Sequence, residues 1–154
     1  MEDDDGDVSG EGKESGPAAV SRFASWKRLP GLDSYLCLDD RQTACLRARL
    51  RLDRSGLAES LVRRRSATSS ACRLCKSSSS ARVVEETLEH ALLHCPAYAA
   101  SRQVLRAHLA DSIPLSCEVI LGCLPPDTPA AAQLEALQAS GAFLRDVMRI
   151  RDGL

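Results

Sequence analysis

Apolar residues recur at helical spacing through most of the chain. The clearest case is a helix predicted over residues 129–151, whose apolar stripe comprises Leu134, Leu137, Gly141, Leu144, Val147 and Met148. The same spacing predicts a helix over residues 96–110, with Pro96 in its first turn, and another over residues 85–94. No stretch alternates convincingly as a strand would, and no internal repeat is visible. The expected fold class is therefore mainly α.

Two shorter helices are predicted upstream. Asp39 or Asp40 is a suitable N-cap for a helix that runs to about residue 52. Its apolar positions place Cys45, Leu46 and Leu50 on one inward face. A second helix, over about residues 57–64, ends in three consecutive arginines and is followed by a loop over residues 66–71.

Composition along the chain divides it into three parts. Residues 1–20 are acidic and rich in glycine and serine, and they lack the apolar residues that would offset the entropy of ordering, so we expect a disordered acidic tail. Residues 21–38 surround a Pro30-Gly31 turn and are expected to form an irregular arm. Residues 39–151 are expected to form a helical domain.

The amino-acid composition limits the core and the membrane topology. Only 3% of the residues are aromatic, so a core must be built from Leu, Val and Ala, and a small core of this kind usually needs a staple. No apolar run approaches the roughly 18 residues of a membrane span, so no membrane partner is expected. The acidic N-terminus resembles neither a secretory signal nor a transit peptide, which favours an intracellular protein.

The strongest chemical signal is a set of cysteines and histidines at metal-ligand spacing. The chain has seven cysteines, an odd number, so metal ligation is a better explanation of a close pair than a disulfide framework. Cys72 and Cys75 form a two-residue knuckle, His90 follows after 14 residues, and Cys95 follows after four more. Four such ligands fit a structural Zn²⁺ ion with no open position. His94 shares a helical face with His90 and is the alternative fourth ligand, although Cys95, just before Pro96, is preferred.

The charge distribution indicates a polyanionic partner. Residues 1–16 hold seven acids and one base, whereas residues 41–76 hold ten bases and two acids. A basic stretch of this kind is typical of nucleic-acid contact. Residues 63–65 are three arginines that can be read as a phosphate clamp, as a nuclear import signal, or as a solvated charge run at a helix C-terminus.

The ligand region resembles a known family. After the knuckle come Glu86-Thr-Leu-Glu-His90 and Leu92-Leu-His-Cys95-Pro-Ala-Tyr98, and then Arg102. This pattern is similar to the zinc-binding segment near the C-terminus of non-LTR retrotransposon reverse transcriptases. The arginine-rich helix upstream and the segments 120–122 and 141–151 downstream extend the resemblance over roughly residues 35–151. The spacer over residues 76–84 departs from the pattern, because it is long and contains four serines.

The resemblance implies the ligand set and the partners. It implies that Cys72, Cys75, His90 and Cys95 hold the zinc ion. The expected role is binding of an RNA or DNA backbone, with a polymerase domain on a parent polyprotein as a further partner and the nucleus as the location. The predicted phosphate contacts are Arg47, Arg49, Arg51, Arg63, Arg64, Arg65, Arg73 and Lys76.

No catalytic motif accompanies this set. In a polymerase box a single residue separates a tyrosine from a pair of aspartates. Here three residues separate Tyr35 from Asp39 and Asp40. No nuclease carboxylate set, phosphate-binding loop or nucleophilic triad is present, so no enzymatic activity and no small-molecule substrate are expected. Two alternatives stay open: a zinc-stapled protein-interaction module, and a degenerate retroelement fragment without a selected function.

Overall fold

The structure is a computed structural model that describes residues 34–75 and 83–153. Within these ranges the chain is mostly helical, as predicted, and its one β-type pairing is an isolated antiparallel bridge between Ala71 and Glu85. The predicted tail over residues 1–20 lies outside the described residues, as does most of the predicted arm over residues 21–38. None of the helices in the described ranges has the length and apolar character of a membrane span.

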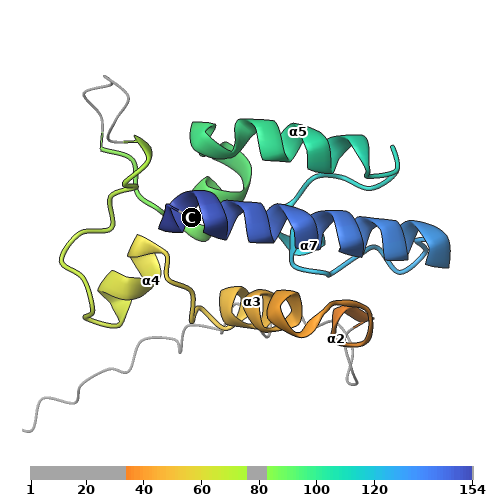
Figure 1. Ribbon diagram of the computed structural model, residues 1–154, viewed down its shortest axis with the longest axis horizontal. Helices are drawn as coiled ribbons and strands as arrows, with labels where there is room; N and C mark the ends of the chain where they lie inside the picture. Colours follow the sequence, from red (N-terminus) through yellow and green to blue (C-terminus); the bar gives the residue numbers. More distant parts are fainter. Residues whose placement is uncertain (1–33, 76–82, 154) are drawn as a thin grey trace, which may run out of the picture.

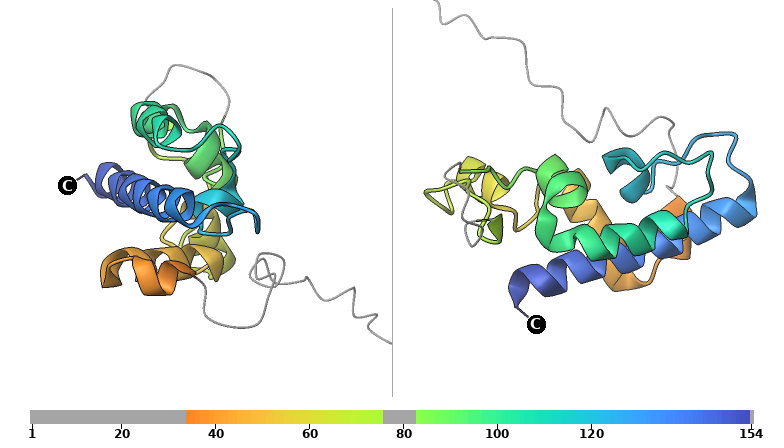
Figure 2. Two further views of the ribbon diagram at one scale, coloured as in Figure 1. Left: turned by 90° about the vertical axis from the view of Figure 1, so that its right-hand side faces the viewer. Right: turned by 90° about the horizontal axis from the view of Figure 1, so that it is seen from above.

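The long helix α7 (Ala130–Asp152) forms the middle layer of the domain. Helix α5 (Ala99–Ala107) packs on one side of it, and α2 (Ser34–Leu38) and α3 (Arg41–Arg51) pack on the other (Figures 1 and 2). Leu137 and Leu144 on α7 are fully buried between the layers, as their spacing predicted. Leu134 is the exception in the predicted stripe, because 40% of it is exposed.

Close packing between α3 and α7 depends on Gly141. A Cβ atom at this position would lie 2.8 Å from Thr43 Cγ2, closer than side-chain carbons approach one another. Glycine therefore lets the two helices meet although it costs helix propensity relative to alanine. At the C-terminal end of α7, Gly153 adopts a left-handed conformation with φ of 74° and terminates the helix.

Helix α3 begins as predicted but turns a different face inward. The Asp40 carboxylate accepts a hydrogen bond from the Thr43 backbone N–H at 3.0 Å, which caps the helix. The buried side chains are Thr43, Arg47, Leu50 and Arg51. The prediction that Cys45 faces inward is wrong, since it is exposed. An arginine in the core is not visible in a hydrophobic pattern, because its burial depends on partners from distant parts of the chain.

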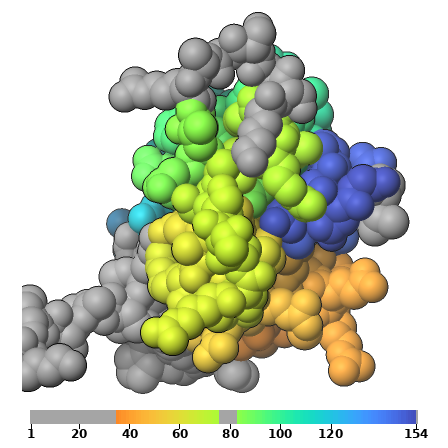
Figure 3. All heavy atoms as spheres, turned by 90° about the vertical axis from the view of Figure 1, so that its left-hand side faces the viewer, coloured from red at the N-terminus to blue at the C-terminus, as the bar shows by residue number. Residues whose placement is uncertain are grey.

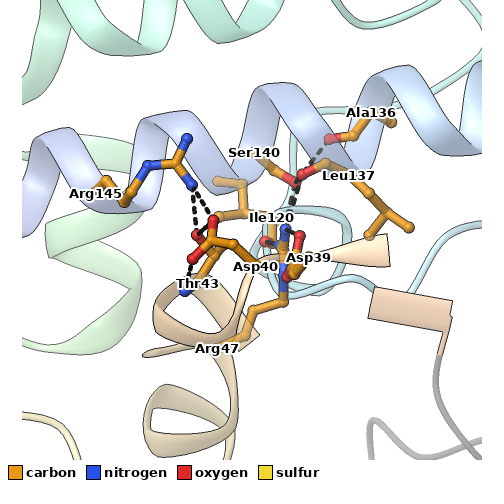
Figure 4. A network of polar contacts seen from close by, with 9 residues as sticks. All are labelled: Asp39, Asp40, Thr43, Arg47, Ile120, Ala136, Leu137, Ser140 and Arg145. Carbon is orange, nitrogen blue, oxygen red and sulfur yellow. Dashed lines mark hydrogen bonds and ion pairs between the residues drawn. The ribbon is translucent and has the colours of Figure 1, made fainter. Parts of the chain in front are cut away.

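Arg47 has those partners (Figure 4). Its guanidinium is completely buried and pairs with the Asp39 carboxylate at 2.7 Å. It also donates to the Leu137 carbonyl at 2.9 Å, to the Ser140 hydroxyl at 3.1 Å and to the Ile120 carbonyl. This set, the Arg47 centre, joins α3, α6 (Cys117–Ile120) and α7 through one satisfied cation.

Residues 34–38 form the helix α2 instead of the irregular structure predicted for this part of the arm. The cause is visible at Tyr35, which is only 3% exposed. Its ring lies 5.8 Å from the Arg47 guanidinium carbon and 5.1 Å from that of Arg51. Cation–π contact with two buried arginines therefore holds the segment against α3.

The remaining elements are short and lie around the cysteine and histidine residues. Helix α4 (Ala58–Arg63) matches the predicted helix over residues 57–64. The helix predicted over residues 85–94 begins only at residue 88 and continues as the π-helical turn η2 (His90–His94). A 3₁₀ turn, η3 (Pro96–Tyr98), then leads into α5. These short elements set the geometry of the candidate site.

Candidate metal centre

Three thiols and one imidazole converge at one end of the domain. The ligand atoms of Cys72, Cys75, His90 and Cys95 all lie within 4.8 Å of one another. Cys95 Sγ is 4.0 Å from Cys72 Sγ and 3.8 Å from Cys75 Sγ, and Cys75 Sγ is 3.4 Å from His90 Nε2. A tetrahedral zinc ion bound by sulfur and nitrogen holds its ligand atoms about 3.5–3.8 Å apart. The spacing of these four atoms therefore suits one metal ion.

A backbone bridge aligns the two arms of the cluster. The Cys72 N–H donates to the Val84 carbonyl at 2.8 Å, and the Glu86 N–H donates to the Ser70 carbonyl at 2.7 Å. These bonds flank the Ala71–Glu85 bridge and hold the knuckle beside the segment that leads to His90. The Thr87 hydroxyl accepts from the His90 N–H at 3.0 Å and fixes the start of the second arm.

The π turn selects the fourth ligand. In an α-helix, side chains four positions apart differ by about 40° around the axis, and those five apart differ by about 140°. The turn η2 instead closes with a bond from the Cys95 N–H to the His90 carbonyl at 2.6 Å, five positions back. This wider turn brings Cys95 to the same side as His90. His94 points outward, with 62% of its side chain exposed and Glu89 as its partner at 3.4 Å.

Burial controls the protonation of these groups. It raises the pKa of the Cys95 thiol to about 12 and also raises the pKa of Cys75. It lowers the pKa of His90, and the positive charge of His94 lowers it further. At neutral pH the imidazole is therefore neutral and ready to coordinate. The two thiols carry protons that a metal cation would displace on binding.

The chemistry of the donor set fits a structural transition-metal site. Thiolates and imidazole are the ligands that zinc prefers, whereas calcium and magnesium prefer oxygen. Four protein ligands leave no position of a tetrahedral ion open to substrate. The structure thus brings together the four residues that the sequence spacing predicted as ligands. The alternative ligand, His94, lies outside the cluster.

A buried ion pair next to the cluster was not foreseen from the sequence. Glu86 is 1% exposed, and its carboxylate accepts from Arg151 Nε at 3.0 Å and from the Ala58 N–H at 2.6 Å. Glu86 therefore caps α4 from a distant part of the chain and ties the ligand region to the end of α7. The only sequence signal was the position of Glu86 inside the ligand motif, because Arg151 lies 65 residues further on.

The structure corrects part of the predicted phosphate-binding set. Arg47 and Arg51 are 0% and 1% exposed, so the prediction that they contact a nucleic-acid backbone is wrong. Their positive charges are used in the core, beside Tyr35 and, for Arg47, Asp39. Lys76 lies outside the described residues.

The other predicted arginines are at the surface and differ in their partners. Arg63 pairs with Asp53 and Glu59, which neutralise it. The Arg64 guanidinium donates to the carbonyls of Ser55 and Ser60 at 2.6 and 3.2 Å and keeps its net charge. Three more are exposed, with no carboxylate partner among the described residues: Arg49, Arg65 and Arg73.

Comparison of the chain with protein-family models, with curated proteins and with solved structures gave no match in any of the three.

Proposed function

We propose that the chain is a non-enzymatic helical domain, stapled by one structural zinc ion, that binds the phosphate backbone of RNA or DNA. The observation that carries the proposal is the convergence of three thiols and one imidazole within 4.8 Å. With four protein ligands, zinc would act as a fixed cross-link between the knuckle and the π turn. A thin core built largely from leucine and alanine gains most from a cross-link of this kind.

The surface charge supports the nucleic-acid part of the proposal. The segment over residues 57–75 lies across the middle of one face of the domain, and the knuckle belongs to the same segment (Figure 3). Arg64, Arg65 and Arg73 are exposed on this segment without carboxylate partners among the described residues. Zinc bound at the knuckle would fix the backbone that presents them. Exposed arginines without counter-ions are suited to phosphate groups.

The resemblance to retroelement reverse transcriptases extends the proposal to the origin, the neighbouring domain and the cellular location of the chain. On that basis the domain derives from the tail of a polyprotein, acts beside a polymerase domain, and works in the nucleus. The arginines at positions 63–65 support nuclear import as well as phosphate contact. In this role the domain holds a template or target strand while another domain performs the chemistry.

The test has two stages. First, metal analysis of the purified chain should give about one zinc ion per molecule. Second, the anisotropy of a labelled single-stranded RNA and of a labelled DNA duplex should report binding that weakens with salt. A contact with Z phosphates gives a slope of about −0.9Z in log affinity against log salt for duplex DNA. If the chain contains zinc but binds neither the RNA nor the DNA at low salt, the nucleic-acid part of the proposal is wrong. The domain would then be a zinc-stapled module for protein partners.

A matched pair of variants locates the surface. Arg65→Gln with Arg73→Gln removes two exposed charges from the proposed face and should reduce the salt slope by about 2. Arg41→Gln with Arg106→Gln removes two exposed charges from the other end of the domain, near the start of α3 and the end of α5. That second pair should leave the slope unchanged. Equal effects of the two pairs would contradict a localised interface.

A further inference from the structure

A hollow of about 500 Å³ lies between the π turn η2, with the residues just before it, and the start of α6. The two elements pack against each other. Three leucines provide apolar lining: Leu88 is buried, and Leu93 and Leu115 are half-buried. Binding sites are typically hollows of about 300–1,000 Å³ with mostly apolar walls. The hollow is therefore large enough to receive an aromatic side chain from another segment.

The hollow also carries negative charge. Its described lining includes the carboxylates of Glu89 and Glu118 and no lysine or arginine. The Glu89 side chain is 70% exposed and contacts the His94 imidazole at 3.4 Å. Glu118 has no ion-pair partner in the described parts of the chain. An apolar hollow with two carboxylates is complementary to a segment that carries cations beside large apolar side chains.

Residues 22–29 of the same chain, the arm segment, have this composition. Three of the eight residues are cations, and the apolar members include Phe23, Trp26 and Leu29. No acidic residue occurs between positions 15 and 32. The chemistry of the arm segment therefore matches that of the hollow in both charge and apolar character.

The other parts of the chain that lie outside the described residues do not match the hollow. Residues 1–14 contain seven acids, which the two carboxylates would repel. Residues 76–82 contain two cations but no large apolar side chain. Charge complementarity thus favours the arm segment as the occupant.

The described chain begins within reach of the hollow. Tyr35 lies just beyond the C-terminal end of α6, because a Cβ atom on Gly122 would be 3.1 Å from Tyr35 Cδ1. The hollow is at the other end of this helix, whose four residues rise only about 6 Å. Residues 30–34, which join the arm segment to Tyr35, can span up to about 17 Å. The arm segment is therefore long enough to reach the hollow.

We propose that the arm segment docks in the hollow between η2 and α6, with the Trp26 ring against the leucines and its cations beside the two carboxylates. The inference goes beyond the proposed function and is independent of it, because neither surface contains a predicted zinc ligand or phosphate contact. Since η2 begins at His90, the docked segment would also brace one arm of the cysteine and histidine cluster.

Trp26 is the single tryptophan of the chain, so its fluorescence reports docking directly. In the full chain the indole should emit at shorter wavelength than after unfolding in urea, and it should be shielded from acrylamide. Glu89→Lys with Glu118→Lys replaces attraction by repulsion and should lower the ratio of docked to undocked segment by about tenfold. Emission should then shift to the red and quenching should increase.

A matched charge reversal provides the control for this experiment. Asp127→Lys with Glu135→Lys changes two exposed acids that do not line the hollow. This pair should leave the emission and the quenching unchanged. Circular dichroism of both double variants checks that the helices are intact.

Disulfide trapping tests the same contact without altering the hollow. Ser25→Cys places a thiol beside Trp26, and under mild oxidation by diamide it should pair with Cys117, which lines the hollow. Ser9→Cys, in the acidic tail, is the matched control and should pair far less. Cys45 is exposed on α3 and reports whether the segment covers that face instead. Peptide mapping by mass spectrometry identifies the pairs.

The outcomes decide between occupants and leave the proposed function to its own tests. A shielded Trp26 that the double variant releases, together with the disulfide to Cys117, supports the inference. Solvated Trp26 in the unmodified chain, or a disulfide to Cys45 in place of Cys117, contradicts it. A disulfide between two chains would assign the hollow to a second copy, and the proposal of docking within one chain would be wrong. Metal content and salt-dependent binding are measured separately and do not change with these results.

Discussion

The domain contains two buried polar centres of opposite character. In the Arg47 centre the protein supplies the cation, and the described residues supply every partner that it needs: one carboxylate, two carbonyls and a hydroxyl. In the cysteine and histidine cluster the protein supplies only potential ligands, two of which are held protonated by burial. The first centre is complete within the chain, whereas the second has the composition of a site that takes its cation from solution.

The two centres also differ in the elements around them. The Arg47 centre joins regular helices, α3 and α7, whose apolar faces already hold them together. The cluster joins a knuckle, one β-bridge, a π turn and a 3₁₀ turn, none of which is stable alone. A metal ion bound at the cluster would therefore contribute most where regular structure contributes least.

Removal of metal is the strongest test of this difference. Chelation, or Cys95→Ser, should remove binding free energy on the order of 10 kcal/mol and lower the thermal midpoint sharply. Circular dichroism during heating, with zinc and with a chelator, measures the effect. Cys45→Ser changes an exposed thiol outside the cluster and is the control. Identical melting curves with and without chelator would remove the distinction between the two centres.

The next largest effect is expected at the Arg47 centre. Arg47→Met leaves Asp39, whose side chain is 5% exposed, as an unpaired buried charge and should cost about 3–5 kcal/mol. Urea unfolding with zinc present measures the loss. Adding Asp39→Asn should recover part of it, because the stranded charge is removed. Arg49→Met on the exposed side of α3 should stay within about 0.5 kcal/mol of the unmodified chain.

A smaller effect tests the packing that supports the Arg47 centre. Gly141→Ala would gain helix propensity, but its new Cβ atom would meet Thr43 Cγ2 at 2.8 Å. Overpacking should outweigh the gain and destabilise the domain by about 1–3 kcal/mol. The neighbouring exposed Ala142 provides the contrast, since Ala142→Gly should cost only about 1 kcal/mol through propensity. Stabilisation by Gly141→Ala in urea unfolding would show that α3 is not tightly packed on α7.

The smallest expected effect sharpens the ligand set of the cluster. His94→Ala removes an exposed imidazole whose ion-pair partner in the described part of the chain is Glu89, so zinc affinity should not change. His90→Ala removes a ligand and should abolish tight binding. Competition of each variant with a colorimetric zinc chelator gives both values. A loss with His94→Ala as large as that with His90→Ala would contradict the π-turn geometry.

The sequence predicted the cluster better than the Arg47 centre, for a physical reason. Metal ligands are recognisable from spacing within a short stretch, here residues 72–95, because one ion must reach all four. The choice between Cys95 and His94 depended on a π turn, and no local pattern distinguishes such a turn from an α-helix. Helix positions along α3, α5 and α7 followed from apolar spacing and caps and were close to the observed bounds.

Burial of Arg47 could not be predicted in this way. Its partners Ile120, Leu137 and Ser140 lie 73 to 93 residues away, and two of them contribute through backbone carbonyls, which exist at every position. The same holds for Glu86 and Arg151. Reasoning that treats arginine as a surface residue therefore assigned Arg47 to a phosphate ligand, whereas its charge is paired in the interior of the domain.

The bridge between Ala71 and Glu85 has a consequence for how the chain tolerates change in length. Because it closes the base of the knuckle arm, with Cys72 bonded to Val84, the positions of the ligands do not depend on how many residues join Cys75 to Val83. In general, doubling the length of a loop adds only about 0.6 kcal/mol to the entropic cost of closing it. The serine-rich spacer is thus a natural insertion point, where an epitope tag or a fluorescent reporter can be introduced while metal stoichiometry is kept.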